Sequence, residues 1–180
     1  MSGGSGPRRA AGGDVILPSI IRGLSSYHLR RGTLTDADAI VHHRIAMFLD
    51  MGLPLDAPAL DRQFRAWLTE MMPAGTYHAW LIETATGEIV AGGGASVLPW
   101  PPGPRYMGDR IAVVYNVYTE PAHRRQGLAR RIMDAIHAWC RDEGIASVAL
   151  NASADGRPLY ESMGYQVPPN PMMFLGLTQG

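Results

Sequence analysis

The segment Asn116-Val-Tyr-Thr-Glu-Pro-Ala-His-Arg-Arg-Gln-Gly-Leu-Ala-Arg-Arg131 joins an apolar run to an amphipathic one. Residues 111–118 are almost continuously apolar or aromatic, which is typical of a central strand covered on both faces. Pro121 forces a turn, and apolar residues then recur at helical spacing, namely Leu128, Ile132, Ile136, Trp139 and Cys140. The pattern predicts a buried strand, a tight turn and a helix packed on a core.

The turn before this helix has the composition of an anion site. A helix N-terminus leaves backbone N–H groups unpaired and carries about half a positive charge, so it attracts phosphates. Gly127 lets the backbone approach a ligand, the small Ala129 keeps that approach open, and positive charge comes from Arg124, Arg125 and Arg130. The alternative is a solvated basic helix start. The Gly-Lys-Ser/Thr element of a P-loop and the glycine spacing of a dinucleotide fingerprint are both absent.

The composition excludes several classes of function. Basic and acidic residues number 16 each, and a net charge of zero argues against nucleic acid or an anionic membrane as the main partner. All the basic residues are arginine, so lysine-dependent Schiff-base chemistry is excluded. The single cysteine, Cys140, excludes an internal disulfide and a Cys-rich zinc site, and we expect no metal.

The chain also lacks the sequence features of a membrane or secreted protein. No apolar run approaches the roughly 20 residues that a membrane span needs. Residues 1–25 are expected to form a flexible leader, without the apolar region of a signal peptide. We therefore predict a cytoplasmic protein whose ordered domain spans residues 26–180.

Periodicity along the rest of the chain predicts an α+β (mixed α/β) single domain. A short strand at 27–30 precedes a helix that Thr35 caps, with Asp38 three residues later as a weak capping box. A second helix carries an apolar stripe over 60–71. The remaining predicted elements are strands at 77–83, 88–98, 111–118 and 145–150, helices at 128–140 and 158–162, and terminal strands at 165–167 and 172–177.

Two motifs in the second half of the chain carry a family resemblance. One is Arg124-Arg125-Gln126-Gly127-Leu128-Ala129, and the other is Leu159-Tyr160-Glu161-Ser162-Met163-Gly164-Tyr165. In this order and spacing they resemble two signatures of the GNAT superfamily of acetyl-CoA-dependent N-acetyltransferases. The resemblance extends over residues 27–177. It implies a GNAT fold, in which helices flank a central, mostly antiparallel sheet with a splayed parallel pair.

The resemblance implies acetyl-CoA as the acetyl donor and assigns its contacts. The strand before the turn would offer backbone groups to the pantetheine arm at Val117, Tyr118 and Thr119, and the N–H of Tyr118 or Thr119 would stabilise the oxyanion. Ser153 stands where the family often has Asn, and would touch the pantetheine or the catalytic tyrosine. The pyrophosphate would lie on the turn, with contacts from Arg124, Arg125, Gln126, Gly127, Leu128, Ala129 and Arg130.

The resemblance also assigns catalytic roles. Tyr160 matches the family tyrosine that protonates the leaving thiolate, although a core aromatic residue is the alternative. Many members carry a glutamate base on the strand equivalent to 111–118, but this strand has no carboxylate, and Glu120 lies just past its end. We hypothesise that Asn116 holds a water together with Asn151 and that this water relays the proton.

These assignments imply transfer of an acetyl group to a primary amine of a small molecule or peptide, by direct attack in a ternary complex. The alternative is a catalytically degenerate acyl-CoA-binding or regulatory domain. The acidic bias of residues 33–72 hints at a small cationic or peptide-like acceptor. His42 and His43 are expected to be an inert, exposed pair. We expect a monomer or homodimer with no nucleic-acid or membrane partner.

Overall fold

The computed structural model describes residue 1, residues 26–104 and residues 106–177. Apart from Met1, the predicted leader therefore lies outside the described residues. In chain order the elements are β1 (Tyr27–Gly32), the 3-10 helix η1 (Leu34–Asp36), α2 (Ala37–Asp50), α3 (Ala57–Met71), β2 (Tyr77–Thr84), β3 (Ile89–Pro99), β4 (Arg110–Thr119), the 3-10 helix η2 (Pro121–His123), α4 (Leu128–Asp142), β5 (Val148–Leu150) and α5 (Arg157–Ser162).

The described strands form one five-stranded sheet in the order β1-β2-β3-β4-β5. Neighbours from β1 to β4 are antiparallel, whereas β4 and β5 are parallel. The parallel pairing runs only from Ala112–Val148 to Val114–Leu150, and β4 then continues to Thr119 without a strand partner on that side. The predicted α+β fold, with a mostly antiparallel sheet and one splayed parallel pair, is confirmed.

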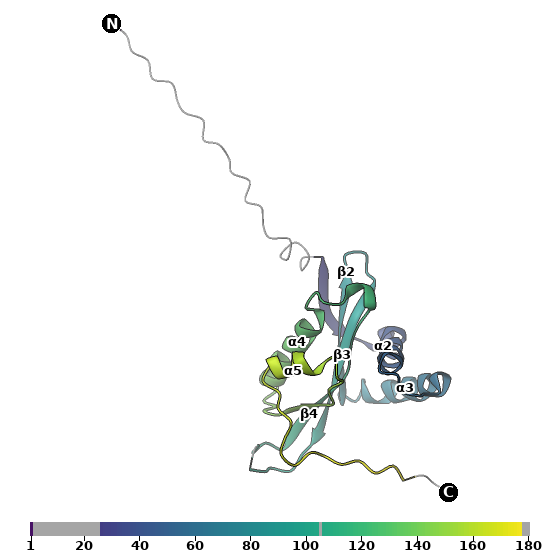
Figure 1. The fold of residues 1–180 in the computed structure, drawn as a ribbon, viewed down its shortest axis with the longest axis vertical. Coiled ribbons are helices and arrows are strands. Elements are labelled where there is room, and N and C mark those ends of the chain that lie inside the picture. The colour runs from purple at the N-terminus through teal and green to yellow at the C-terminus, as the bar shows by residue number, and fades with distance from the viewer. Residues whose placement is uncertain (2–25, 105, 178–180) are drawn as a thin grey trace.

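Helices cover both faces of the sheet (Figure 1). α4 and α5 lie on one face, and α2 and α3 lie on the other. The core on the α4 face includes Leu128, Ile132, Met133, Ile136 and Tyr160. The core on the α2 face includes Ile40, Val41, Phe64, Leu68 and Tyr77. Among the described helices, none combines the length and the apolar character needed to cross a membrane.

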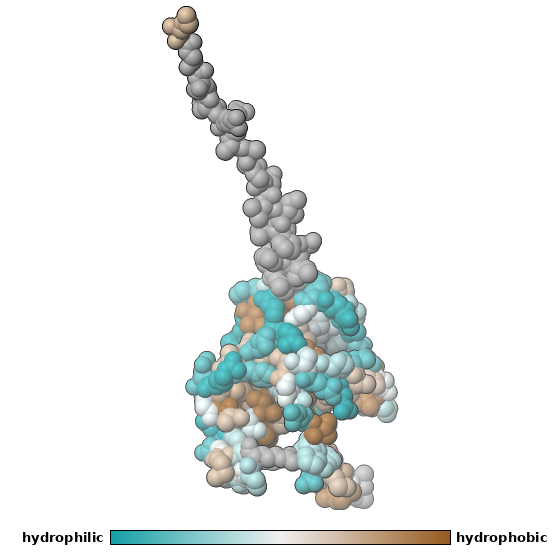
Figure 2. Space-filling model, turned by 60° about the vertical axis from the view of Figure 1, so that its left-hand side comes forward, coloured by the Kyte–Doolittle hydropathy of each residue, from teal (hydrophilic) through white to brown (hydrophobic). Residues whose placement is uncertain are grey.

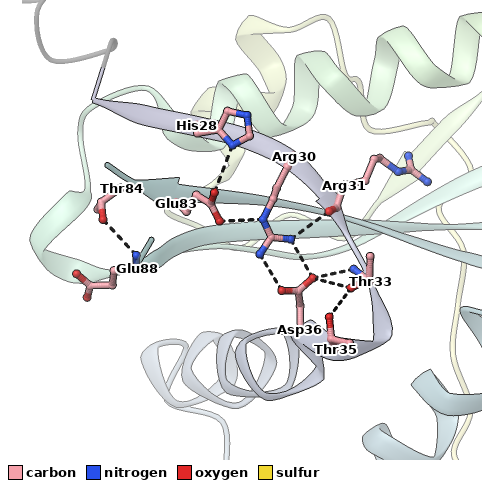
Figure 3. Close-up of polar contacts among 9 residues, drawn as sticks. All are labelled: His28, Arg30, Arg31, Thr33, Thr35, Asp36, Glu83, Thr84 and Glu88. Carbon is pink, nitrogen blue, oxygen red and sulfur yellow. Dashed lines mark hydrogen bonds and ion pairs between the residues drawn. The ribbon is translucent and has the colours of Figure 1, made fainter. Parts of the chain in front are cut away.

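A charged network fixes the start of α2 against β1 and β2 (Figure 3). Arg30 donates from Nη1 and Nη2 to Asp36 at 2.9 and 2.8 Å, and from Nε to Glu83 at 2.8 Å. Asp36 also accepts from the backbone N–H of Thr33 at 2.8 Å. The hydrogen bonds from Arg30 are the main reason that the pKa of Asp36 falls to about 2.

The first helix begins differently from the prediction. Thr35 and Asp38 were expected to form the capping pair, but Thr33 and Asp36 form the capping box. The reason is η1, a 3-10 turn that precedes α2 and moves the cap toward the N-terminus. Such turns are frequent at helix starts and leave no mark on a 3.6-residue period.

The last strand is shorter than the predicted 145–150. The N–H of Ile145 donates to the carbonyl of Cys140 at 2.7 Å, and the Ile145 side chain is buried in the core of the α4 face. Ile145 therefore closes the end of α4 instead of extending β5. In the sequence, an apolar residue after a helix-ending glycine looks the same whether it closes the helix or begins the next strand.

The terminal strands predicted at 165–167 and 172–177 do not form, since the described part of the chain contains no strand after β5. Pro168, Pro169 and Pro171 lack the N–H that a sheet ladder needs. Residues 166–177 are exposed, apolar side chains included. Figure 2 shows separate apolar patches on a mostly hydrophilic face of the molecule.

The middle of β3 is built from consecutive glycines, Gly92 to Gly94, that let other elements lie directly on its backbone. A Cβ on the first would lie 2.7 Å from Nδ1 of His43, on α2. A Cβ on the second would lie 2.8 Å from Cγ2 of Ile132, on α4. A Cβ on the third would overlap the ring of Tyr77. Side chains on both faces of the sheet therefore pack directly against the backbone of β3 where it has no side chains of its own.

Gly94→Ala should lower the free energy of unfolding by about 2–3 kcal/mol, because the added methyl group overlaps the Tyr77 ring in a packed core. Urea unfolding followed by circular dichroism measures the change. Gly103→Ala is the matched control, because a Cβ there meets nothing within 4 Å, and it should cost less than about 0.5 kcal/mol. Equal effects at the two positions would show that β3 is not closely packed at Gly94.

Candidate functional site

The turn between β4 and α4 is held open by two residues with left-handed backbone conformation. η2 follows the end of β4, and after it Arg125 has a φ of 63° and Gly127 a φ of 77°. Gly127 is the N-cap of α4, and its side chain, being hydrogen, cannot cap the helix. Successive backbone N–H groups in a turn of this kind point into a common concavity that suits an anion.

The backbone N–H groups of residues 125–130 have no hydrogen-bond partner among the described residues. The first bonded amide of the helix is that of Arg131, which donates to the carbonyl of Gly127 at 3.1 Å. A Cβ built on Gly127 would meet nothing within 4 Å, so the space beside this glycine is open. Free amides, the helix dipole and open space are the features that favour an anion at this turn.

The arginine side chains of the turn contribute unequally to this site. Arg124 donates from Nε to the carbonyl of Thr119 at 2.9 Å and forms an ion pair with Asp50 of α2. Arg130 donates to the Ser162 hydroxyl on α5 at 2.5 Å. Arg125 is exposed and has no hydrogen bond or ion pair within the described ranges. Its guanidinium is therefore the one most available to a bound anion.

The remaining predicted residues of the turn also have structural partners. The side chain of Gln126 accepts a hydrogen bond from the Tyr27 hydroxyl at 3.1 Å, which ties the turn to β1. Leu128 is buried in the core, whereas Ala129 is half-buried at the helix start. These residues therefore bring backbone amides, not side chains, to the concavity.

β4 offers an open edge next to this turn. Beyond Val114 it has no partner on the β5 side within the described strands, so residues 115–119 run with one edge free. This segment includes the predicted pantetheine contacts Val117, Tyr118 and Thr119. On its other side β4 remains paired with β3, for example Tyr118 with Gly92. The free edge can therefore pair with an extended ligand without disturbing the sheet.

A β-bulge in the same segment turns Asn116 toward the α2 face. The register between β3 and β4 shifts here, and Asn116 has a φ of 57°, which Asn tolerates better than most residues. Its side-chain oxygen accepts from Nη1 of Arg44 at 2.6 Å, and its amide donates to the Tyr77 hydroxyl at 3.2 Å. Asn151, its proposed partner for a water, is exposed just after β5.

Tyr160 lies on α5, on the same face of the sheet as α4 (Figure 1). It is 8% exposed and belongs to the core cluster that contains Leu128, with Val117 packed against it. Burial raises the pKa of its phenol, so the hydroxyl stays protonated at neutral pH. The predicted neighbour Ser153 accepts from the N–H of Gly156 at 3.1 Å and so shapes the start of α5.

The sequence analysis missed a buried polar group on the opposite face. His43 is 2% exposed, not a surface residue, and its ring centroid lies 5.4 Å from that of Tyr118, with the two planes tilted by 40°. Glu120 accepts from Nε2 of His42 at 2.8 Å, and its Oε1 lies 3.7 Å from Nε2 of His43. The signal for His43 was its position three residues after the core residue Ile40, on the same side of the helix.

Neither a surface hollow nor a metal site offers an alternative location for the functional site among the described residues. A hollow of about 470 Å³ between α2 and α3 is lined by Ile45, Ala57, Pro58, Asp61 and Arg62. It is remote from both the open amides and Tyr160, which lie with α4 on the other face (Figure 1). In the part of the chain that the structure describes, no group of His, Cys, Asp and Glu side chains is arranged to hold a metal ion.

Comparison with known proteins accounts for these features together. Residues 41–165 match the model of the Acetyltransferase (GNAT) family. The chain is similar to a GCN5-related N-acetyltransferase from Ralstonia eutropha JMP134, with 32% identity, a TM-score of 0.78, and coverage of 84% of this chain and 98% of that one.

Two more distant structures share the fold. A predicted acetyltransferase from Clostridium acetobutylicum, solved with acetyl-CoA, has 24% identity and a TM-score of 0.72, covering 84% of this chain and 96% of that one. An aminoglycoside N-acetyltransferase in complex with CoA has 14% identity and a TM-score of 0.66, covering 83% of this chain and 94% of that one.

The burial of His43 predicts an acid-sensitive fold. Burial lowers the pKa of His43 to about 4, so between pH 6.5 and 4 the unfolded chain takes up a proton that the folded chain does not. The free energy of unfolding should therefore fall with pH in this window, by up to about 3 kcal/mol. Urea titrations of the wild type and His43→Gln at pH 7, 6 and 5 measure this loss, which the variant should not show. Parallel curves for the two proteins would contradict the assignment.

Proposed function

The chain belongs to the GNAT acetyltransferase family, and on this premise we propose that it transfers an acetyl group from acetyl-CoA to a primary amine. The amine belongs to a small molecule or peptide and attacks directly in a ternary complex. The observation that carries the proposal is the row of free amides at residues 125–130, next to a buried phenol on the same face of the sheet.

The free groups of the chain fit the parts of acetyl-CoA in order. The amides of residues 125–130 and the exposed Arg125 suit the pyrophosphate, because backbone donors at a helix start favour a compact anion. The open edge of β4 suits the amide-containing pantetheine arm, which can pair as an added strand. The end of that arm would then lie near Val117 and Tyr160, which share the core of the α4 face.

Two groups of the chain suit the chemistry of transfer. Acetyl-CoA, when bound, supplies an acetyl group activated as a thioester. A backbone N–H of Tyr118 or Thr119 would donate to the oxygen on which negative charge develops. Tyr160 would give its proton to the departing sulfur, since a phenol is protonated at neutral pH.

The group that removes the proton from the amine is the less defined part of the proposal. β4 carries no carboxylate over residues 111–118, and Glu120 is hydrogen-bonded to His42. The proposal keeps Asn116 as the residue that would hold a relay water at the bulge. Because its amide already binds Arg44 and Tyr77, this role would use the second lone pair of its oxygen.

A degenerate acyl-CoA-binding domain is the alternative, favoured by the missing strand carboxylate. The two functions differ in turnover and not in binding. Isothermal titration with acetyl-CoA, combined with a thiol-release assay on a broad amine panel, separates them. Binding with turnover supports the enzyme, binding without turnover supports the alternative, and absence of binding contradicts both.

Gly127→Val should weaken CoA binding by at least about tenfold, because the new side chain projects into the amide turn and strains a positive φ. Isothermal titration measures the dissociation constant. Gly144→Val is the matched control, because Gly144 also has a positive φ, 69°, and open space around its Cβ, but lies at the other end of α4. Both variants should lose similar thermal stability. Equal loss of binding would place the cofactor elsewhere.

Tyr160→Phe should lower kcat by about 100-fold, because the variant lacks the proposed acid, and should leave CoA affinity almost unchanged. Tyr165→Phe is the control, because the ring centroids of Tyr160 and Tyr165 lie 5.8 Å apart. The Tyr165 hydroxyl, however, is hydrogen-bonded to Nε2 of His137 at 2.7 Å. Steady-state rates across pH 6–10 test this. A Tyr160→Phe enzyme with the wild-type rate and pH profile would remove Tyr160 from catalysis.

A further inference from the structure

Arg44, in the middle of α2, is a cation without a counter-ion among the residues that the structure describes. Nη1 donates to the side-chain oxygen of Asn116 at 2.6 Å, and Nε is buried with no hydrogen-bond partner among the described residues. The guanidinium carbon lies 4.6 Å from the Phe64 ring centroid and 5.0 Å from that of Phe48. This packing holds the planar group in one orientation while part of the residue stays accessible.

The acids of the neighbouring helices do not pair with Arg44. Within the described residues all but Glu70 have other partners: Asp36 pairs with Arg30, Asp38 and Asp61 with Arg65, and Asp50 with Arg124, while Asp56 caps α3. The acidic bias of this region is therefore largely neutralised, and it gives little support to the cationic acceptor suggested by the sequence. Burial lowers the pKa of Arg44, with only the phenols of Tyr77 and Tyr115 acting in the opposite direction.

Arg44 contacts the segment where the acceptor has to arrive. Its partner Asn116 forms the bulge of β4, inside the segment whose other edge is free. The side chains of Tyr115 and Asn116 both reach the α2 face, opposite α4 and Tyr160. If acetyl-CoA lies on the α4 side, as the proposed function requires, the acceptor reaches the thioester from the α2 side, past Arg44.

We propose that Arg44 binds the carboxylate of the acceptor, so that the substrate is a primary amine that also carries a carboxylate, such as an amino acid. A partly buried guanidinium is stabilised by an anion that enters with the substrate. With Nη1 bound to Asn116 and Nε enclosed, Nη2 is left to donate to a carboxylate oxygen, since it has no hydrogen-bond partner among the described residues. Tyr77 stays protonated, with a pKa raised by burial to about 12, so its phenol brings no negative charge to Arg44.

The test uses amines in matched pairs, with and without the carboxylate. L-Phenylalanine, L-methionine and L-glutamate are each compared with the corresponding α-carboxamide, and O-phosphoethanolamine is added as a phosphate-bearing amine. The full-length protein, saturated with acetyl-CoA, is assayed for kcat/KM, and the protein saturated with CoA is titrated calorimetrically with the same compounds. Because the carboxamides hold more neutral amine at neutral pH, chemistry alone favours them.

The wild type should prefer at least one acid over its carboxamide. Arg44→Gln should lower kcat/KM for that acid by about 100-fold while changing the value for the carboxamide less than about threefold. Arg44→Lys keeps the charge but loses the planar arrangement of donors, so its kcat/KM for the acid should lie between the values of the wild type and Arg44→Gln. If Arg44→Gln does not fold, judged by its circular dichroism and CoA binding, the lysine variant carries the comparison.

The binding arm separates this inference from the proposed function. Arg44-dependent binding of acids without any turnover would support the carboxylate site and contradict the enzyme. Acetylation without preference for acids, or a preference that survives in Arg44→Gln, would overturn the carboxylate site and leave the enzyme intact. Preference for O-phosphoethanolamine over every acid, or failure of the whole panel to bind or react, would also overturn the inference.

Discussion

β4 leaves its parallel partner after Val114, and residues 115–119 then run on with one edge unpaired. This separation leaves main-chain groups free along β4 and leads the chain into the turn whose amides are also free. It coincides with the bulge at Asn116, which turns a polar side chain onto the other face. The open edge follows from this incomplete strand pairing, and the Arg44 contact follows from the bulge beside it.

The two faces of the sheet then differ in chemistry. The α4 face combines open backbone donors with the phenol of Tyr160 inside an apolar core. The α2 face carries a cation that lacks a counter-ion, next to Asn116 and Tyr77. Acyl transfer needs the reacting ends of two ligands to come into contact while the residues that bind each ligand stay separate. A sheet opened at one edge provides that separation, because only the reacting ends of the ligands have to share the gap.

The local features of the fold were predictable from sequence, and the long-range ones were not. The apolar run of β4 and the stripe of α4 predicted their elements, and the two motifs that resemble GNAT signatures predicted the family, which the comparison confirms. The partners of Arg124 and His43 were missed, because Asp50 and Glu120 are distant in sequence. The prediction of the terminal strands was wrong because the apolar pattern favoured strands whereas the prolines opposed them. The N–H groups that proline lacks prevented the pairing.

At the glycines at 92–94 the sheet consists of backbone alone, without side chains on either face. His43 and Tyr77 rest on one side of this short stretch, and Ile132, one turn into α4, rests on the other. Any displacement of α4 would therefore press on the same main chain that contacts Tyr77, the hydrogen-bond partner of Asn116. Only a single layer of backbone separates the two sides. Under the proposed function the donor and the acceptor would bind on opposite sides of this layer, and their affinities should be thermodynamically linked.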